Sequence, residues 1–192
     1  MTNEKNFIKN KKQILEKLEV AKKEKLVDKG IIPIIDIINS NENYYTSSSC
    51  YGRIVLLELP NLGDKKNAEF LGKWHRKIRS NDVFLALENS SGKGQLWFLA
   101  QSPIIHVYTK NIESADKLVK IAVNCGFKHS NFKSSEKNII VEIASTERID
   151  APVGLNGKLY CDKKYIFLLV DIANRVYNKS ILKLEKLKNT LC

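Results

Sequence analysis

The sequence predicts a single α+β domain over residues 1–192, and three observations lead to this fold class. The chain has 192 residues, of which 43% are hydrophobic, so it can enclose one sizeable core. Segments of strand and helix character interleave without the strict rhythm of a parallel α/β fold. The chain has no G-x-G-x-x-G run and no Walker loop, which disfavours a Rossmann-like nucleotide fold. We therefore expect one mixed sheet with long amphipathic helices at both ends of the chain.

The first forty residues predict two helices. Residues 4–28 form an amphipathic helical pattern among many lysines, and this helix is expected to end near Gly30. Its apolar stripe consists of Ile8, Leu15, Leu18 and Leu26. Residues 31–41 are apolar and contain Pro33, which only a first helical turn tolerates. We expect a short helix or turn there.

A polar run and a buried strand follow. Strand character begins at Tyr44, and residues 46–53 then hold hydroxyl, thiol and glycine groups before an arginine. A serine-rich run is often only a turn, but small residues also let a ligand approach the backbone, and Arg53 can hold a carboxylate or phosphate with its planar fork. The apolar run 54–59 predicts a strand covered on both faces. Residues 61–77, with glycines and mixed charges, are expected to form a functional loop.

The middle of the chain predicts a helix, two strands and a second helix. Residues 80–88 begin with good capping residues and predict a short helix. Residues 95–101 and 104–108 predict strands that a Ser-Pro pair separates. The helix after them is bounded by Asn111, a suitable N-cap, and by Gly126, a suitable residue for the C-terminal turn.

The last third predicts two neighbouring strands and a long helix. Residues 127–133 and 139–145 have strand character around a polar turn, and residues 154–157 form another turn. From residue 162 to about residue 191 the apolar positions recur in steps of three and four. One face of this helix is therefore expected to pack on the sheet.

Basic residues gather at the two ends of the chain. Lys and Arg number 32 against 21 Asp and Glu, and the formal net charge is +11. The terminal helices, residues 1–30 and 162–192, are the basic elements. This excess favours an anionic partner, with nucleic acid first, although exposed lysines on a helix need no partner. Because no apolar run reaches the ~18–20 residues of a membrane span and no secretory signal is present, we expect a soluble, cytoplasmic protein with no membrane partner.

The cysteines and histidines give no metal-binding pattern. The four cysteines lie far apart in the sequence, without a C-x-x-C pair, so we expect reduced thiols and no metal. His106 stands in a strand where alternation places it opposite Ile105 and Val107, so it either faces a ligand or is a half-buried structural histidine.

An aromatic residue stands among the basic residues of the 61–77 segment. Trp74 and His75 follow one another there, and this pairing suits base stacking with phosphate contact, but Trp74 could equally anchor the loop to the core. The basic side chains around them are Lys65, Lys66, Lys73 and Arg76. His129 has the same two interpretations.

Six motifs in this order resemble the tRNA wybutosine-synthesizing protein 3 family, archaeal branch. The first is the S/T-x-S-S-C-x-G-R signature, met by Thr46, Ser48, Ser49, Cys50, Gly52 and Arg53. The others are LGDK at 62–65, FLGKWH at 70–75, SPIIHV at 102–107, CGFKHSN at 125–131 and STERIDAP at 145–152. The resemblance covers residues 28–173, nearly the whole chain.

The resemblance implies an S-adenosylmethionine-dependent methyltransferase without a Rossmann-like fold. Its expected substrate is tRNA(Phe), held by the anticodon arm, and its target is N4 of the 7-aminocarboxypropyl-demethylwyosine base 3′ of the anticodon. The signature residues are the expected cofactor site, and His106, Asp28 and His75 are the candidate catalytic residues. The expected tRNA contacts include the basic cluster with Trp74, as well as His129, Ser130, Ser145 and Thr146. One departure is Ala144, where we expect an arginine, and it removes one anion contact.

These candidate residues suit methyl transfer. The reaction needs a methyl donor and an acceptor nitrogen held in line, and a base to take the proton. A histidine can exchange that proton at neutral pH. The rival interpretations are a noncatalytic RNA-binding module, which would bind no S-adenosylmethionine, and a methyltransferase for small molecules or proteins.

Overall fold

The computed structural model describes residues 2–64, 66–135 and 138–192, and the chain divides into two compact units. The first unit comprises Met1–Tyr51, Pro103–Thr146 and Ile181–Cys192, and the second comprises Gly52–Ser102 and Glu147–Ser180. The α+β class is confirmed. The strands form two sheets rather than one mixed sheet, and every described strand pair is antiparallel. A single domain over residues 1–192 remains a prediction.

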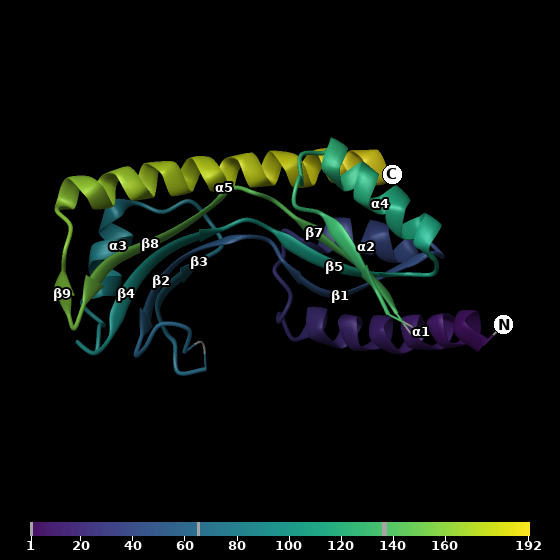
Figure 1. Cartoon of the computed structure of the whole chain (residues 1–192), viewed down its shortest axis with the longest axis horizontal. Coiled ribbons are helices and arrows are strands. Elements are labelled where there is room, and N and C mark those ends of the chain that lie inside the picture. Colours follow the sequence, from purple (N-terminus) through teal and green to yellow (C-terminus); the bar gives the residue numbers. More distant parts are fainter. Residues whose placement is uncertain (1, 65, 136–137) are drawn as a thin grey trace. The chain divides into compact units, whose positions relative to one another are not determined.

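The sheet of the first unit has four strands in the order β1 (Tyr44–Cys50), β5 (Ile104–Thr109), β7 (Ile139–Ala144) and β6 (Asn131–Ser134). Helix α1 (Thr2–Lys23) lies on one side of it, and α4 (Ile112–Asn124) lies on the other (Figure 1). Helix α2 (Ile32–Ser40) and α4 bury their apolar faces against Ile105, Val107, Val141 and Ile143. The alternate residues of β5 and β7 therefore face α1.

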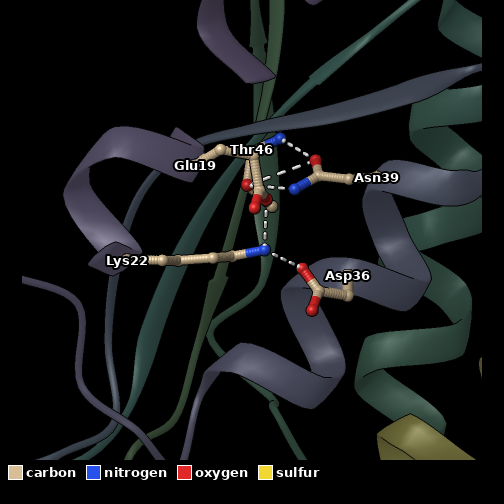
Figure 2. A network of polar contacts seen from close by, with 5 residues as sticks. All are labelled: Glu19, Lys22, Asp36, Asn39 and Thr46. Atoms are coloured by element: carbon tan, nitrogen blue, oxygen red, sulfur yellow. Dashed lines mark hydrogen bonds and ion pairs between the residues drawn. The ribbon is translucent and has the colours of Figure 1, made fainter. Parts of the chain in front are cut away.

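A β-bulge in β1 decides which side chains reach that second face. Thr46 pairs with Val107, but the next paired residue is Ser48, opposite His106. The extra residue leaves Thr46 on the core side, where its backbone N–H donates to Asn39 Oδ1 at 2.7 Å and Asn39 Nδ2 donates to Thr46 Oγ1 at 3.0 Å (Figure 2). Ser48 lies on the opposite side from Thr46, as a bulge of one residue requires.

Helix α1 ends at Lys23, seven residues before the predicted end at Gly30. The N–H of Leu26 donates to Ala21 O and that of Lys25 to Lys22 O, which is the Schellman pattern. Lys25 takes the left-handed φ of 59° that glycine usually supplies, so the sequence carries no glycine signal at this end. Lys22 joins α1 to α2, because its ammonium group lies 2.6 Å from Glu19 and 2.5 Å from Asp36 (Figure 2).

The sheet of the second unit has five strands in the order β3, β2, β4, β8 and β9. They are β3 (Glu69–Trp74), β2 (Arg53–Leu59), β4 (Gln95–Gln101), β8 (Arg148–Leu155) and β9 (Lys158–Leu159). Helix α3 (Ser80–Leu87) and the first turns of α5 (Lys163–Leu191) pack on one face (Figure 1). The predicted strands and helices of residues 54–59, 80–88, 95–101 and 162–191 are confirmed.

Two strands of this sheet were not predicted. Residues 61–77 are expected as a loop, but Glu69–Trp74 is an edge strand with no buried side chain and no apolar alternation. In β8, the side chains of Ala151 and Val153 are buried, but charged residues and Pro152 interrupt the pattern. Residues 46–50, expected as part of a turn, belong to strand β1.

The predicted ends of α4 are confirmed. Asn111 caps α4 by accepting a hydrogen bond from Ser114 N at 2.8 Å, and Gly126 follows the helix with a φ of 100°. Cys50, Cys125, Cys161 and Cys192 form no disulfide in the part of the chain that the structure describes. Among the described residues, no helix combines the length and apolar character that a membrane crossing requires.

Glu58 is a buried carboxylate that holds the turn before β4. It accepts hydrogen bonds from Ser90 Oγ at 2.9 Å, Ser91 N at 2.8 Å and Lys93 N at 3.2 Å. Burial by itself raises the pKa of Glu58, but these hydrogen bonds outweigh burial and leave the pKa below its ordinary value. The ionised carboxylate therefore stabilises the fold.

We expect Glu58→Gln to lower the free energy of unfolding by about 1–3 kcal/mol, the usual cost of losing charge-assisted hydrogen bonds at a buried group. Because the folded-state pKa is lowered, the contribution of Glu58 is complete above its ordinary pKa and is lost as the pH falls through the lowered value. Urea unfolding at neutral and acidic pH measures both effects, with the exposed Glu88→Gln as control. Equal stability losses in the two variants would contradict this role.

Candidate active site

A chain of three polar side chains crosses the α1-facing side of the first unit's sheet. Ser48 Oγ lies 2.9 Å from His106 Nδ1, and His106 Nε2 lies 3.0 Å from Glu142 Oε2. The three residues come from neighbouring strands β1, β5 and β7, where pairing places His106 opposite both partners. All three are at least partly exposed, while Ile105 and Val107 are fully buried, which confirms the predicted orientation of His106.

These contacts fix the tautomer of His106. A carboxylate can only accept, so Nε2 carries a proton and donates it to Glu142. In the neutral ring Nδ1 is then an acceptor, and Ser48 Oγ donates to it. The basic lone pair of His106 therefore lies at Nδ1, where the Ser48 hydroxyl covers it. A proton arriving at Ser48 Oγ can pass to Nδ1, and Glu142 stabilises the imidazolium that results.

Asp28 holds the backbone at the end of β1, directly after the signature residues Ser49 and Cys50. Asp28 Oδ2 accepts a hydrogen bond from Tyr51 N at 2.9 Å, so this carboxylate holds the backbone that follows Cys50. The ring of Tyr51 fills the space that a Cβ at Gly30 would need, so glycine is required there. Asp28 thus positions the signature segment, and its predicted role as a base remains a prediction.

A cavity of about 360 Å³ lies between α1 and the serine-rich strand. Its walls combine the hydroxyl-bearing residues 46–49 with apolar side chains from α1 and the segment after it, namely Ile14, Leu18, Ala21, Leu26 and Val27. This volume lies within the range of small-molecule sites, which typically have mostly apolar walls and a few polar groups. Thr46 lines the cavity, but its hydroxyl is buried against Asn39 and is not offered to a ligand. Its predicted cofactor contact is better explained as positioning of the strand.

The second unit holds the last two signature residues. Gly52 is buried at a φ of 91°, which side chains rarely adopt. Arg53 Nε donates to Gln101 Oε1 at 2.7 Å, and the guanidinium lies 5.4 Å from the Phe70 ring centroid. The terminal nitrogens of Arg53 have no hydrogen-bond partner among the described residues. The guanidinium of Arg53 is therefore held in place, and its terminal nitrogens can bind an anion.

His75 supports the same segment. Its Nδ1 lies 3.0 Å from Gly52 O, and because a carbonyl only accepts, Nδ1 is the donor. The hydroxyl of Tyr177 donates to His75 O at 2.7 Å. These contacts favour a positioning role for His75, while its predicted catalytic role remains a prediction.

The predicted tRNA-binding residues of the second unit differ in their surroundings. Trp74 is half-buried against the core and its ring covers Gly72, which favours the anchoring interpretation. Arg76 pairs with Asp82 at 2.9 Å, and Lys73 lies 5.7 Å from the Phe70 ring centroid. Lys66 is exposed, and Lys65 lies outside the described residues.

The other predicted tRNA contacts belong to the first unit. Ser145 Oγ accepts a hydrogen bond from Lys183 at 2.7 Å, and Ser130 Oγ accepts one from Ala144 N at 3.3 Å. His129 and Thr146 are exposed. Ala144 stands two residues after Glu142 and so shares its face of β7. An arginine there would add a positive charge near Glu142 and His106. The roles of these residues remain predictions.

Sequence reasoning missed Glu142 and Gln101. Alternation in residues 139–144 buries Val141 and Ile143, and therefore places Glu142 on the face that His106 occupies. That signal is present in the sequence, but it becomes useful only once β5 and β7 are known to be paired. Gln101 stands opposite Arg53 in the β2–β4 register, which the sequence alone does not give.

The chain belongs to a class of methyltransferases that is built on antiparallel sheets. A family model described as Methyltransferase TYW3 matches residues 9–192, and the chain is a member of that family. A curated relative from Pyrococcus horikoshii is 48% identical over 97% of this chain and 95% of its own length. It is named tRNA(Phe) 7-((3-amino-3-carboxypropyl)-4-demethylwyosine(37)-N(4))-methyltransferase 1. The relative from Methanocaldococcus jannaschii has the same name without the final number and is 42% identical over 88% of each chain.

Solved structures agree with this fold. A protein of Pyrococcus horikoshii superposes with a TM-score of 0.94 at 47% identity, covering 100% of this chain and 99% of the other. A protein of Aeropyrum pernix, titled as hypothetical, gives a TM-score of 0.73 at 26% identity over 85% of this chain and 96% of its own. The family resemblance expected from the six motifs is confirmed.

Proposed function

We propose that this protein transfers a methyl group from S-adenosylmethionine to N4 of the 7-aminocarboxypropyl-demethylwyosine base of tRNA(Phe). The observation that carries the proposal is the Ser48–His106–Glu142 relay, which begins at Ser48 of the family's signature and offers one basic lone pair. Membership of the family supports this reaction, and so does the curated relative that is named for it. We place the enzyme in the cytoplasm with its tRNA substrate.

The residues present fit S-adenosylmethionine. The cavity beside residues 47–49 offers hydroxyl groups and apolar walls, and these match a ligand with a charged amino-acid end and an adenosine. When bound, the cofactor supplies an electrophilic methyl group. Ser49 is our proposed contact for its amino-acid end in the first unit, where Cys50 ends the same strand. Arg53 and Gly52 of the second unit remain predicted cofactor contacts.

The protein's own contribution is proton removal and orientation. As N4 of the base is methylated it becomes cationic, and its proton must leave. Ser48 Oγ can accept that proton while its own proton passes to His106 Nδ1, and Glu142 stabilises the charged ring. This assigns Ser48 to the base relay rather than to the cofactor. Basic side chains of α1 and of the 66–76 segment hold the anticodon arm, and the target base leaves its stack.

Two measurements test the proposal. Calorimetric titration of S-adenosylmethionine into the protein should show one saturable site, and labelled methyl groups should pass to tRNA(Phe) that carries the precursor base. A noncatalytic RNA-binding module would bind tRNA without a cofactor site. A methyltransferase for other substrates would bind the cofactor but leave this tRNA unlabelled.

We expect Arg53→Lys to weaken S-adenosylmethionine or tRNA binding by about tenfold. The lysine ammonium retains the charge but cannot make the paired hydrogen bonds of a planar guanidinium. The lysine also loses the hydrogen bond that Arg53 Nε gives to Gln101. The matched control is Arg175→Lys, since Arg175 pairs with Asp171 on the exposed surface of α5. Calorimetry and filter binding measure the two affinities. Wild-type values for Arg53→Lys would make this arginine structural.

A further inference from the structure

A polar groove runs between α1 and the sheet of the first unit and adjoins the cavity of about 360 Å³ assigned to the cofactor. Two neighbouring cavities form it, with volumes of about 230 and 220 Å³. The larger of these shares Ile14, Lys17 and Ser47 with the cofactor cavity, and the two share Asn10, Tyr45, Tyr108 and Asn138 with each other. The groove thus continues from the signature strand along α1 to the far edge of the sheet.

Helix α1 turns a stripe of polar side chains toward this groove. Asn6, Asn10, Gln13 and Lys17 recur at helical spacing and all line it. A helix that only covers a sheet usually turns apolar residues toward it. The side chains of Asn6 and Gln13 have no hydrogen-bond partner in the part of the chain that the structure describes. Their amides can therefore donate to and accept from a ligand.

The sheet supplies an aromatic and hydroxyl-lined wall. Tyr108 stacks on Tyr45 with ring centroids 4.9 Å apart and an interplanar angle of 2°. Tyr45 is buried, while Tyr108 is partly exposed and lines two of the cavities. The exposed side chains of Ser134, Ser135 and Asn138 add further polar groups. Burial raises the pKa of Tyr45 to about 12, so its hydroxyl stays neutral beside a ligand.

The charge of the groove favours one class of ligand. Its described lining contains two cations, Lys17 and Lys110, and no aspartate or glutamate. Lys110 is held 2.5 Å from Glu4, which leaves Lys17 as the less constrained cation. Amides that read base edges, an aromatic surface and scattered lysines are the groups with which proteins bind single-stranded RNA.

We propose that this groove binds unpaired nucleotides adjacent to the modified base, with Asn6 and Gln13 contacting base edges. The inference rests on the proposed function for the identity of the RNA. It assigns a base-contacting role to α1, which otherwise contributes only the positive charge of a basic helix. Binding there would hold the RNA chain beside the relay at the other end of the groove.

The test is a double substitution, Asn6→Ala with Gln13→Ala. We expect it to weaken binding of a short single-stranded RNA with the anticodon-loop sequence of tRNA(Phe) by about tenfold, as the loss of two hydrogen bonds predicts. Because no charge is removed, the slope of log affinity against log salt should stay unchanged. The matched control is Asp116→Ala with Lys120→Ala, a charge-balanced pair on α4, across the sheet from α1. Fluorescence anisotropy measures affinity, and circular dichroism checks the fold.

Each outcome separates the inference from the proposed function. Equal RNA affinity in the groove variant and the control overturns the inference, even if the wild-type protein methylates tRNA(Phe). A selective loss in the groove variant supports the inference, even if the wild-type protein transfers no methyl group. A selective loss that comes with a changed salt slope overturns base contact by the amides, because it indicates a phosphate contact instead.

Discussion

Replacing His106 with asparagine should slow single-turnover methyl transfer by roughly 10²–10⁴-fold, the usual contribution of a positioned general base. Asparagine keeps similar bulk and can still hydrogen-bond to Ser48 and Glu142, but an amide does not take up the proton. S-adenosylmethionine binding and thermal stability should stay near their wild-type values. Rapid-quench assays with saturating tRNA, run beside thermal unfolding, measure the rate and the stability separately.

Companion variants locate the proton path. His106→Ala should be as slow as His106→Asn, and Ser48→Ala should also be slow because the lone pair at Nδ1 is reached through the Ser48 hydroxyl. Glu142→Gln keeps an acceptor for Nε2 but removes the charge that stabilises the imidazolium, so the rate should fall with little change in stability. A fully active His106→Asn enzyme would remove His106 from catalysis, and Asp28 or His75 would become the candidate base.

Binding of tRNA should weaken by at least about 10³-fold between 50 and 200 mM salt, which is the loss expected when six or more phosphates are contacted. The reason is the basic excess of the terminal segments, where residues 1–30 carry nine basic and five acidic side chains. Most of the lysines of α1 are exposed, among them Lys5, Lys9 and Lys12.

Filter binding over a salt series measures this dependence. S-adenosylmethionine affinity in the same buffers is the control, because a small ligand releases few counterions and should respond weakly. A tRNA affinity that stays constant up to near-molar salt would show that the basic surface is not the docking surface.

Regular elements with strong patterns could be predicted from the sequence. Helix α4 has a capping asparagine, apolar residues at helical spacing and a terminal glycine, and all three signals agree with the structure. Strand β2 is continuous and apolar. By contrast, the edge strand β3 has no buried side chain, and the end of α1 depends on Lys25 in the left-handed conformation that glycine usually adopts. Neither feature leaves a local signal that propensity or periodicity can detect.

Two of the three residues of the candidate site could be named from the sequence, but the contacts between them could not. The motifs identify Ser48 and His106, but a sequence does not show which strands pair, so the contact between them and the third member, Glu142, could not be derived. For Thr46 the sequence suggested a ligand contact that the structure does not favour. Its place in the signature suggests a ligand contact, whereas the bulge turns it toward Asn39 in the core. Faces of a strand are predictable only as far as its pairing is regular.

The bulge at Ser47 also makes this strand tolerant of a change in length. Because Thr46 and Ser48 are paired with consecutive residues of β5, Ser47 is the one position of β1 whose removal leaves every pair in register. A single-residue deletion elsewhere in the strand would invert the faces of all residues beyond it. Loss of Ser47 would therefore change the groove wall while the pairing of Ser48 with His106 is kept.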